Sequence, residues 1–264
     1  MTTHRHLALV TGASNGIGRD IATVLAQRNH DLVLVARREA VLLDVATKLE
    51  KQHGVAAHVI SADLAATDAA DRLVEKLSAR SLTVDVLVNN AGYGLYGKVI
   101  DTNADAELAM IQLNVVALYR LTKLLVPGMV ARKRGRIMNV ASTAAFFSGA
   151  YMAVYFATKA FVLSLSEALD EELAGSGVTV TCLCPGPTAT AFREVAGSTK
   201  SKAAERPQEP SMPVAEAGVD AMLNGVRLYI PGAKNRFETS MARLLPRRMM
   251  AGIVGRAQGG DSHS

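Results

Sequence analysis

The start of the chain carries the feature that most limits its fold: a buried strand followed at once by a glycine-rich turn. Leu7-Ala8-Leu9-Val10 is a short apolar run, typical of a strand that is buried on both faces. The stretch Thr11 to Gly18 follows, and then apolar residues at helical spacing. Gly12 would permit a tight turn, Gly16 would let the backbone approach a pyrophosphate, and Gly18 would permit close packing of the helix on the strand. The pattern predicts a dinucleotide-binding unit, with candidate contacts from Gly12, Ser14, Asn15, Gly16, Ile17 and Gly18.

Strand-like and helix-like segments alternate along the rest of the chain as far as Ile230. Further strands are expected at residues 31–36, 55–60, 84–88, 136–140, 178–184 and 226–230, with a helical pattern between each pair. Six strand–helix units and a last strand predict a single α/β domain built on a doubly wound parallel sheet. With 49% hydrophobic residues, the chain of 264 residues can bury the core that such a domain needs.

The end of the second strand is expected to select the cofactor. Proteins that bind NAD place an acidic residue there for the ribose hydroxyls, whereas those that bind NADP offer an arginine to the 2′-phosphate. This chain has Ala36-Arg37-Arg38 at that point, and its first acidic residue there is Glu39. We therefore predict NADP(H), with Arg37 as the main contact and Arg38 beside it. The alternative is that both arginines only begin a solvated helix.

Other strand ends supply candidates for the rest of the nucleotide, because cofactor contacts gather at the carboxyl edge of open α/β sheets. Asp63 is a candidate for the adenine amino group, and an equally open alternative is that it caps the next helix. The side chains of Asn89 and Asn90 could hold neighbouring strands together, and the small residues after them leave room for a ribose. The candidates from these strand ends are Asp63, Leu64, Asn90, Ala91, Gly92, Pro185, Gly186 and Thr188.

Tyr155 and Lys159 are the clearest candidates for chemistry. They lie four residues apart in an apolar run, residues 151–173, that has helical spacing and ends before Gly175. Their side chains would therefore share one face of a helix. A nearby ammonium group would lower the pKa of a tyrosine from about 10, so that Tyr155 could exchange a proton with a carbonyl or alcohol oxygen. The alternative is an accidental pair on a helix surface.

Asn114 and Ser142 are two further polar candidates. Asn114 lies inside a long helix expected from Ala104 to about Val130, which Pro127 would bend or end. A buried amide there needs hydrogen-bond partners, from backbone or from water. Ser142 follows the strand that ends at Val140, so it lies at another strand end.

In order and spacing, these motifs resemble the short-chain dehydrogenase/reductase family of the classical type. The resemblance rests on the glycine turn, Asn89 to Gly92, Asn114, Ser142, the Tyr155/Lys159 pair and Pro185-Gly186, and it spans about residues 7–230. It implies a seven-stranded parallel sheet of the Rossmann type, a nicotinamide cofactor, and a homodimer or homotetramer.

The resemblance also implies a role for each residue. Tyr155 would be the general acid that protonates a carbonyl oxygen, and Ser142 would hydrogen-bond that oxygen. Lys159 would lower the pKa of Tyr155 and hold the nicotinamide ribose. Asn114 would anchor a water that resupplies the proton through Lys159. Donors aimed at the oxygen would stabilise the transition state of hydride transfer more than the ground state.

We expect an NADP(H)-dependent oxidoreductase that interconverts a ketone or aldehyde and an alcohol. The candidate substrate residues are Tyr93, Leu95, Phe147, Tyr151 and Phe192. Because they are largely apolar, they favour a small hydrophobic substrate, a steroid-like or acyl-chain ketone, over a sugar or an acid. The alternative is a non-catalytic NADP(H)-binding sensor that acts through a protein partner.

The two ends of the chain lead to further expectations. Residues 1–232 would form the catalytic domain, with the polar segment 189–213 as a substrate loop or lid. Residues 233–264 would form a basic C-terminal extension, whose stretch Leu244 to Arg248 resembles a subgroup of bacterial reductases. We expect this extension to pack on the core or at an interface; contact with a membrane surface is a less favoured alternative.

Several classes of function are not expected. Basic residues do not interleave with aromatic ones, which argues against nucleic-acid binding, and no set of metal ligands accompanies the two cysteines. Cys182 and Cys184 read as buried, reduced thiols. We find no signal peptide and no apolar run of about 20 residues, so a cytoplasmic location is expected.

Overall fold

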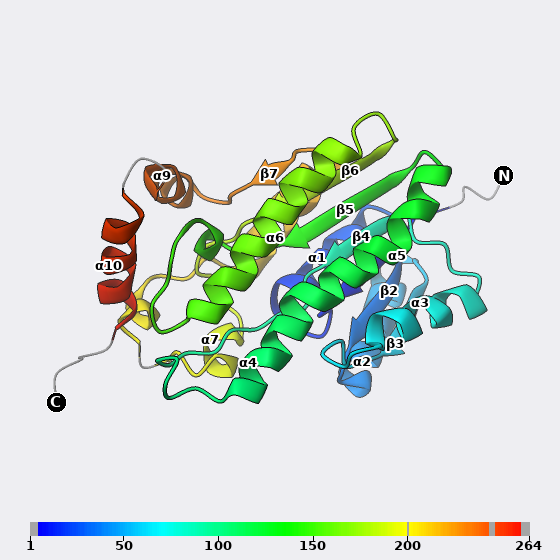
Figure 1. Ribbon diagram of the computed structural model, residues 1–264. Coiled ribbons are helices and arrows are strands. Elements are labelled where there is room, and N and C mark those ends of the chain that lie inside the picture. The colour runs from blue at the N-terminus through cyan, green and yellow to red at the C-terminus, as the bar shows by residue number, and fades with distance from the viewer. Residues whose placement is uncertain (1–4, 200, 243–245, 260–264) are drawn as a thin grey trace.

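A seven-stranded parallel sheet forms the centre of the molecule (Figure 1). The structure is a computed structural model that describes residues 5–199, 201–242 and 246–259. The strands are β1 (Leu7–Thr11), β2 (Asp31–Ala36), β3 (Ala57–Ser61), β4 (Val86–Asn89), β5 (Gly135–Val140), β6 (Val178–Leu183) and β7 (Leu228–Tyr229). Their order in the sheet is β3-β2-β1-β4-β5-β6-β7, so the direction of winding reverses between β1 and β4. The predicted doubly wound parallel sheet is confirmed.

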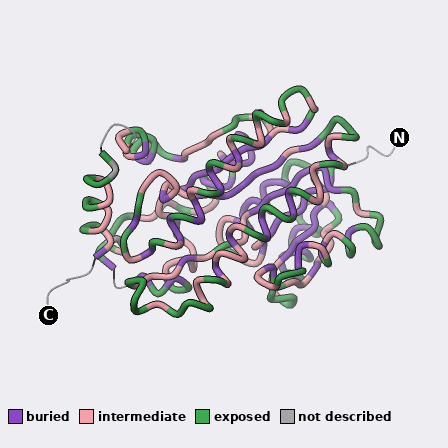
Figure 2. The backbone as a smooth tube through the Cα atoms, in the orientation of Figure 1, coloured by how far each residue is buried: buried purple, intermediate pink, exposed green. Residues whose placement is uncertain are grey.

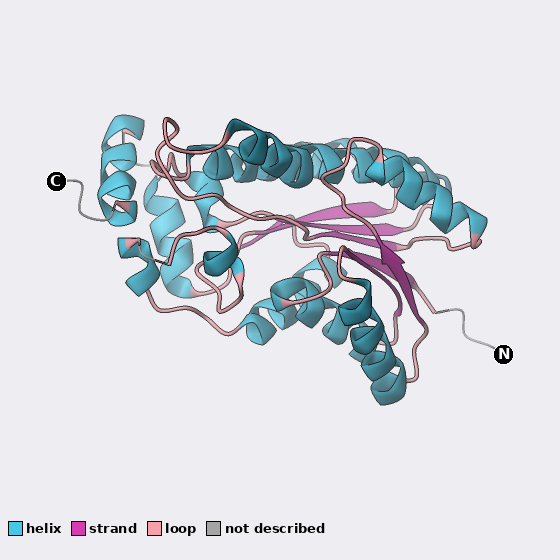
Figure 3. Ribbon diagram, turned by 90° about the horizontal axis from the view of Figure 1, so that it is seen from below, coloured by secondary structure: helices cyan, strands magenta, loops and turns pink. Residues whose placement is uncertain are grey.

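Helices cover both faces of this sheet (Figure 3). One face carries α1 (Gly16–Gln27), α2 (Glu39–His53) and α8 (Ser211–Leu223), and the other carries α3 (Ala69–Ala79), α5 (Leu118–Ala131) and α6 (Ala153–Glu172). Ala8 and Val10 of β1 pack into the first layer, whereas Leu7 and Leu9 pack into the second. Both faces are covered, which explains why the strands read as continuous apolar runs and why they are buried in Figure 2.

The edge strand β7 is shorter than the five residues expected from 226 to 230. Only Leu228 and Tyr229 pair with β6. Pro231 follows closely and has no N–H group to offer a further ladder bond, which limits the strand. Cys182 and Cys184, at the end of β6, are free and buried, with their Sγ atoms 3.7 Å apart.

The long helix expected from Ala104 contains a segment of different geometry. Helix α4 (Ala104–Ile111) continues through a π-helix, η1 (Gln112–Ala117), into α5. Pro127 lies inside α5 and does not end it. Contrary to expectation, Ala104–Ala131 is long and apolar enough to cross a membrane by length and composition, the one such helix among the described residues. Here it packs Leu121 and Met129 onto the sheet, while Leu108, Val116 and Tyr119 are exposed.

The lid and the extension contain more helix than expected. In the segment 189–213, α7 (Phe192–Val195) and the 3-10 helix η3 (Lys202–Glu205) form, and α8 already begins at Ser211. The extension forms two helices, α9 (Ala233–Ala242) and α10 (Arg247–Gln258), and both lie at the left end of the view in Figure 1. Leu244 and Leu245 of the subgroup stretch lie outside the described residues.

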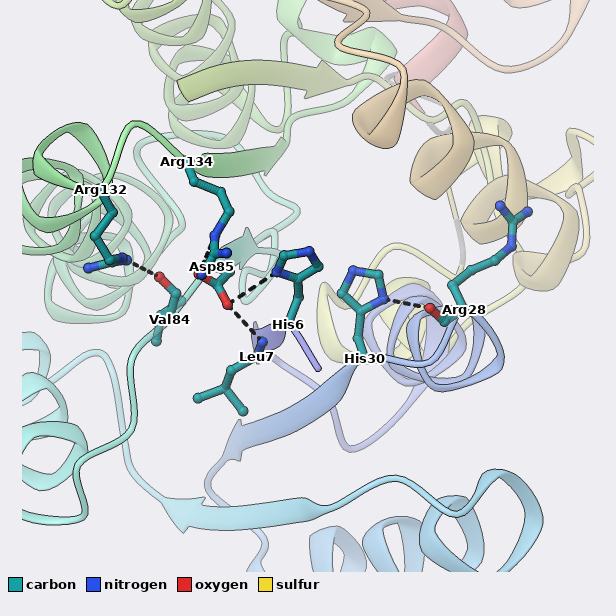
Figure 4. A network of polar contacts seen from close by, with 8 residues as sticks. All are labelled: His6, Leu7, Arg28, His30, Val84, Asp85, Arg132 and Arg134. Carbon is teal, nitrogen blue, oxygen red and sulfur yellow. Dashed lines mark hydrogen bonds and ion pairs between the residues drawn. The ribbon is translucent and has the colours of Figure 1, made fainter. Parts of the chain in front are cut away.

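A polar network joins three strands at their amino ends, on the opposite edge from the predicted site (Figure 4). The buried carboxylate of Asp85, before β4, accepts from the Leu7 backbone N–H at 3.2 Å and from Arg134 Nη2 at 3.0 Å. His6 Nδ1 lies 3.4 Å from the same carboxylate, and the ring centroids of His6 and His30 are 5.9 Å apart. Because a buried charge requires partners, these contacts hold the starts of β1, β4 and β5 together.

Candidate active site

The predicted site residues converge on the carboxyl edge of the sheet. The residues that follow successive strands there are Gly12 (β1), Arg37 (β2), Asn90 (β4), Ser142 (β5) and Pro185 (β6). The winding reverses between β1 and β4, and ligands of open α/β sheets bind in the crevice outside such a switch point. The topology therefore brings together side chains that are up to about 170 positions apart in the sequence.

The glycines between β1 and α1 are required by the backbone. Gly12 has a φ of +67°, in the left-handed region that favours glycine. A Cβ atom on Gly18 would lie 2.4 Å from the Gly12 carbonyl oxygen and 2.2 Å from Asn90 Nδ2. These observations match the tight turn and the close packing that the sequence predicted.

The start of α1 suits an anion. Asn15 is the N-cap, but its side chain makes no capping hydrogen bond, and no acidic residue lies in the first turn. The first N–H groups of a helix lack partners within the helix, and together with the helix dipole they favour a negative charge. The glycine turn and the open helix end therefore fit a dinucleotide pyrophosphate.

Arg37 and Arg38 are both exposed at the end of β2, beside this turn. Arg38 Nη2 lies 3.5 Å from Ser14 Oγ, so one guanidinium group reaches across to the glycine turn. Asp63 is exposed after β3, and its carboxylate accepts from the Ala65 N–H at 3.1 Å. It does not cap a helix, because the N-cap of α3 is Asp68; that alternative is wrong.

Asn90 holds β4 to β1, with a partner that the sequence analysis missed. Its side chain donates to the Thr11 carbonyl at 2.9 Å. The buried hydroxyl of Thr11 accepts from the backbone N–H groups of Asn90 and Ala91 at 2.9 and 3.0 Å, and donates to the Val88 carbonyl at 3.2 Å. A threonine as the last residue of a strand, directly before the glycine turn, is the signal that could have identified it.

Two hydroxyl groups meet beyond the end of β5. Ser142 caps the 3-10 helix η2 (Thr143–Phe146), and its Oγ accepts from the Ala144 N–H at 3.1 Å. Tyr155, in the first turn of α6, lies close enough to the Ser142 side chain for that hydroxyl to affect its pKa. Since the two hydroxyls are neighbours, one ligand oxygen can reach both of them.

Lys159 lies one turn further along α6 and is buried with Tyr155; their exposed fractions are 6% and 8%. The pair is therefore no accident of a helix surface. Lys159 Nζ lies 5.9 Å from the centroid of the Tyr155 ring and donates to the Val140 carbonyl at 2.8 Å. The helical period gives the two side chains a common face, as predicted.

The pKa of Tyr155 corrects the expectation drawn from this pair. Burial raises the pKa of Tyr155 to about 12, with a smaller opposite effect of the Ser142 hydrogen bond. Burial also lowers the pKa of Lys159 to about 8. The prediction that Lys159 lowers the pKa of Tyr155 is wrong for the protein without a ligand. Desolvation of the phenolate dominates, and the Lys159 ammonium group is hydrogen-bonded to the Val140 carbonyl. Tyr155 is therefore a protonated acid at neutral pH.

Asn114 reaches the site through the π-helix. Its Oδ1 accepts from the Tyr93 N–H at 3.1 Å, and its Nδ2 donates to the Tyr93 carbonyl at 2.9 Å and to Thr158 Oγ1 at 3.1 Å. A Cβ atom on Gly92 would lie 2.9 Å from Asn114 Oδ1 and 3.5 Å from Lys159 Nζ. Asn114 thus bonds backbone, as one alternative held, and lies close to Lys159. Thr158, which sequence reasoning missed, links Asn114 to the Tyr155 carbonyl at 2.7 Å.

The candidate substrate residues gather around Tyr155. Tyr93, Leu95, Phe147 and Phe192 all pack with Tyr155 and Met152 in one apolar cluster. The ring centroids of Phe192 and Tyr155 are 5.2 Å apart. Tyr151 lies at the edge of this cluster, where its ring stacks on Tyr96 with centroids 5.9 Å apart. The proton donor is thus surrounded by apolar side chains.

The segment 189–213 begins directly over the glycine turn. Thr188 donates to the Gly186 carbonyl at 3.0 Å, and Thr190 lies so close to Gly16 that a Cβ atom there would meet it at 2.9 Å. Gly186 in turn packs against Asn235 of α9, which shows that the extension rests on the core. Thr190 was not predicted, since only the fold brings the lid onto the first turn.

A model of the short chain dehydrogenase family matches residues 6–201. The chain belongs to the short-chain dehydrogenase family. The very-long-chain 3-oxoacyl-CoA reductase of Laccaria bicolor is 38% identical over 175 residues, which are 66% of this chain but 52% of that reductase. An uncharacterized oxidoreductase of Staphylococcus epidermidis is 35% identical over 188 residues, 71% of this chain and 80% of the relative. The chain thus spans about half the length of the fungal reductase.

Solved structures extend the likeness of this short-chain dehydrogenase over almost the whole chain. A short-chain dehydrogenase from Sphingobium yanoikuyae in complex with NADPH has 31% identity and a TM-score of 0.81, covering 98% of this chain and 100% of that one. The bulky-bulky ketone specific alcohol dehydrogenase from Comamonas testosteroni has 28% identity and a TM-score of 0.78, covering 99% and 98%. L-Sorbose reductase from Gluconobacter frateurii, complexed with NADPH and L-sorbose, has 28% identity and a TM-score of 0.74, covering 86% and 94%.

Proposed function

We propose that this short-chain dehydrogenase reduces a hydrophobic ketone to the corresponding secondary alcohol with NADPH. In the overall reaction, ketone, NADPH and a proton give alcohol and NADP⁺. The observation that carries the proposal is the contact between the Ser142 and Tyr155 hydroxyls, buried among apolar side chains beside Lys159. Two donors that converge on one point stabilise an oxygen that gains negative charge.

Each residue then has a task at a defined atom. Ser142 Oγ holds the ketone oxygen, and Tyr155 Oη gives that oxygen a proton. A phenol with a pKa of about 12 is fully protonated at neutral pH, so the acid form that reduction needs is always present. Lys159 supplies a positive charge beside the site below a pH of about 8. Lys159 would also hold the nicotinamide ribose of a bound cofactor. When bound, NADPH supplies the hydride that the carbonyl carbon accepts.

NADP(H) is the cofactor that the residues at the end of β2 fit. Arg37 and Arg38 are exposed there, and Arg38 reaches Ser14 on the glycine turn, so a 2′-phosphate beside that turn would meet guanidinium groups. No carboxylate precedes Glu39 at this strand end to compete for the ribose hydroxyls. The structures from Sphingobium and Gluconobacter that resemble this chain hold NADPH, which supports the assignment.

The substrate class follows from the cluster around Tyr155. Its rings and aliphatic side chains favour a hydrophobic ketone over a sugar. The similarity to the very-long-chain 3-oxoacyl-CoA reductase of Laccaria and to the bulky-bulky ketone specific alcohol dehydrogenase of Comamonas supports an apolar substrate. The likeness to L-sorbose reductase shows that the fold also admits a sugar. We infer that the apolar groups of the substrate pack against Phe147 and Phe192.

The test is a panel of ketones with purified protein and NADPH, followed by loss of nicotinamide absorbance. We expect turnover with aryl and long-chain ketones and little with L-sorbose. If the protein binds NADPH tightly but reduces no ketone in the panel, the proposed function fails and the sensor alternative takes its place.

A further inference from the structure

The C-terminal helix α10 lies against the cluster that surrounds Tyr155. Val254, half-buried on α10, packs in the same apolar cluster as Tyr155, Phe147 and Phe192. The helix also packs against η3 of the lid, and it lies at the end of the molecule remote from the N-terminus in Figure 1. A segment that is about a hundred residues beyond Tyr155 in the sequence therefore borders the candidate substrate site.

Two stacked tyrosines hold α10 in this place. Tyr96 Oη donates to the Gln258 carbonyl, at the last turn of α10, at 2.9 Å. The Tyr96 ring stacks on Tyr151, and Gly259 touches the far part of the Tyr151 ring: a Cβ atom there would lie 3.2 Å from Tyr151 Cε2. The Tyr96 hydroxyl and the Tyr151 ring thus tie the end of α10 to the edge of the candidate site, and we call these two contacts the latch.

The latch is braced from the core side. The Tyr96 N–H donates to the Ala196 carbonyl at 2.9 Å, and the Gly97 N–H donates to the Tyr151 carbonyl at 2.8 Å. Tyr151 has a φ of +64°, which a bulky residue adopts only when its surroundings hold it there. The segments on both sides of the site therefore fix the two rings, and α10 packs against a rigid surface.

The two faces of α10 differ in burial, as expected for a helix that lines one side of a pocket. Val254 and Gln258 point toward the site side and are half-buried, whereas Ile253 on the neighbouring face is 41% exposed. Deletion or addition of a methylene group in an apolar pocket changes discrimination between substrates by about 10- to 200-fold. The size of the side chain at position 254 should therefore determine how large a substrate the pocket accepts.

We propose that α10 is the outer wall of the substrate pocket, latched by Tyr96, and that Tyr96 and Val254 determine how large a ketone the enzyme accepts. The inference rests on the proposed function, and it adds the residues that set specificity. Tyr96 acts through α10 and is a positioning residue, whereas Val254 meets the part of the substrate that is distant from the carbonyl group.

The first experiment measures the latch without catalysis. Hydrogen exchange of the amides in α10 is compared in the wild-type protein, in Tyr96→Phe and in Tyr119→Phe, a matched control whose ring is 44% exposed on α5. Loss of one net hydrogen bond should speed α10 exchange in Tyr96→Phe by about threefold to tenfold. Unchanged exchange in Tyr96→Phe would refute the latch.

The second experiment measures specificity as the ratio of kcat/KM for benzophenone to that for acetophenone. Val254→Phe should lower this ratio by at least about tenfold, and Val254→Ala should raise it. Ile253→Ala, one position away on the exposed face, should leave it unchanged. If both Val254 variants leave this ratio unchanged and reduce acetophenone normally, the proposal that α10 lines the substrate pocket is refuted and the proposed function stands. If the wild-type protein turns over no ketone, the proposed function itself is refuted.

Discussion

Replacement of Tyr155 by phenylalanine removes one oxygen atom and leaves the ring packing in place. The ring keeps its contacts with Phe192 and Phe156, whose centroids lie 5.2 and 6.1 Å away. The Ser142 hydroxyl keeps the hydrogen bond that it accepts from the Ala144 N–H. The cost to folding is therefore at most one net hydrogen bond, about 1 kcal/mol, and the variant should remain folded.

The effect on catalysis should be far larger. The phenol is the one group in contact with Ser142 that is a protonated acid across the neutral range, because burial raises its pKa to about 12. Loss of a positioned general acid typically lowers the rate by about 10²–10⁴-fold, and we expect kcat/KM for the ketone to fall by this factor.

The assay compares wild-type protein, Tyr155→Phe and Tyr119→Phe under identical conditions. Loss of nicotinamide absorbance gives kcat/KM, the change in the fluorescence of NADPH itself gives the Kd of NADPH, and thermal unfolding reports on the fold. We expect Tyr155→Phe to lose turnover but to bind NADPH within about threefold of wild type. Turnover within tenfold of wild type in Tyr155→Phe would show that another group delivers the proton.

Three further outcomes can be tested. Burial lowers the pKa of Lys159 to about 8, so its positive charge is lost as pH rises through that value. We therefore expect kcat/KM for reduction to fall with an apparent pKa near 8, and a kcat/KM that stays constant into alkaline pH would contradict this. Arg37→Ala should lower kcat/KM with NADPH by about tenfold to a hundredfold and leave that with NADH nearly unchanged, and equal losses with both cofactors would contradict the role of Arg37. Burial also lowers the pKa of His30 from 6.5. As pH falls through 6.5 the unfolded chain therefore binds more protons than the folded chain, and the free energy of unfolding decreases. In denaturant unfolding, His30→Gln should show a smaller decrease of this free energy with falling pH than the wild-type protein, and an equal decrease would exclude His30 as the cause.

Local pattern was sufficient for the fold and for much of the candidate site. A buried strand, a glycine turn and a helix can pack together in few ways, so the glycines at 12 and 18 could be assigned from sequence, and their geometry agrees. The helical period likewise places Tyr155 and Lys159 on one face. Parallel strands end at one edge of a sheet, which is why Asn90 and Ser142 could be grouped with them.

The chemistry of that site, in contrast, was decided by packing over long distances in the sequence. A pKa depends on the water that a group loses, and the sequence did not show that burial would raise that of Tyr155 to about 12. The π-helical turn that aims Asn114 at the Tyr93 backbone spans six residues, too few for its different period to show in the apolar pattern. The contact of Tyr96 with Gln258 joins residues 162 positions apart, and such a contact exists only once the whole sheet has brought the two segments together.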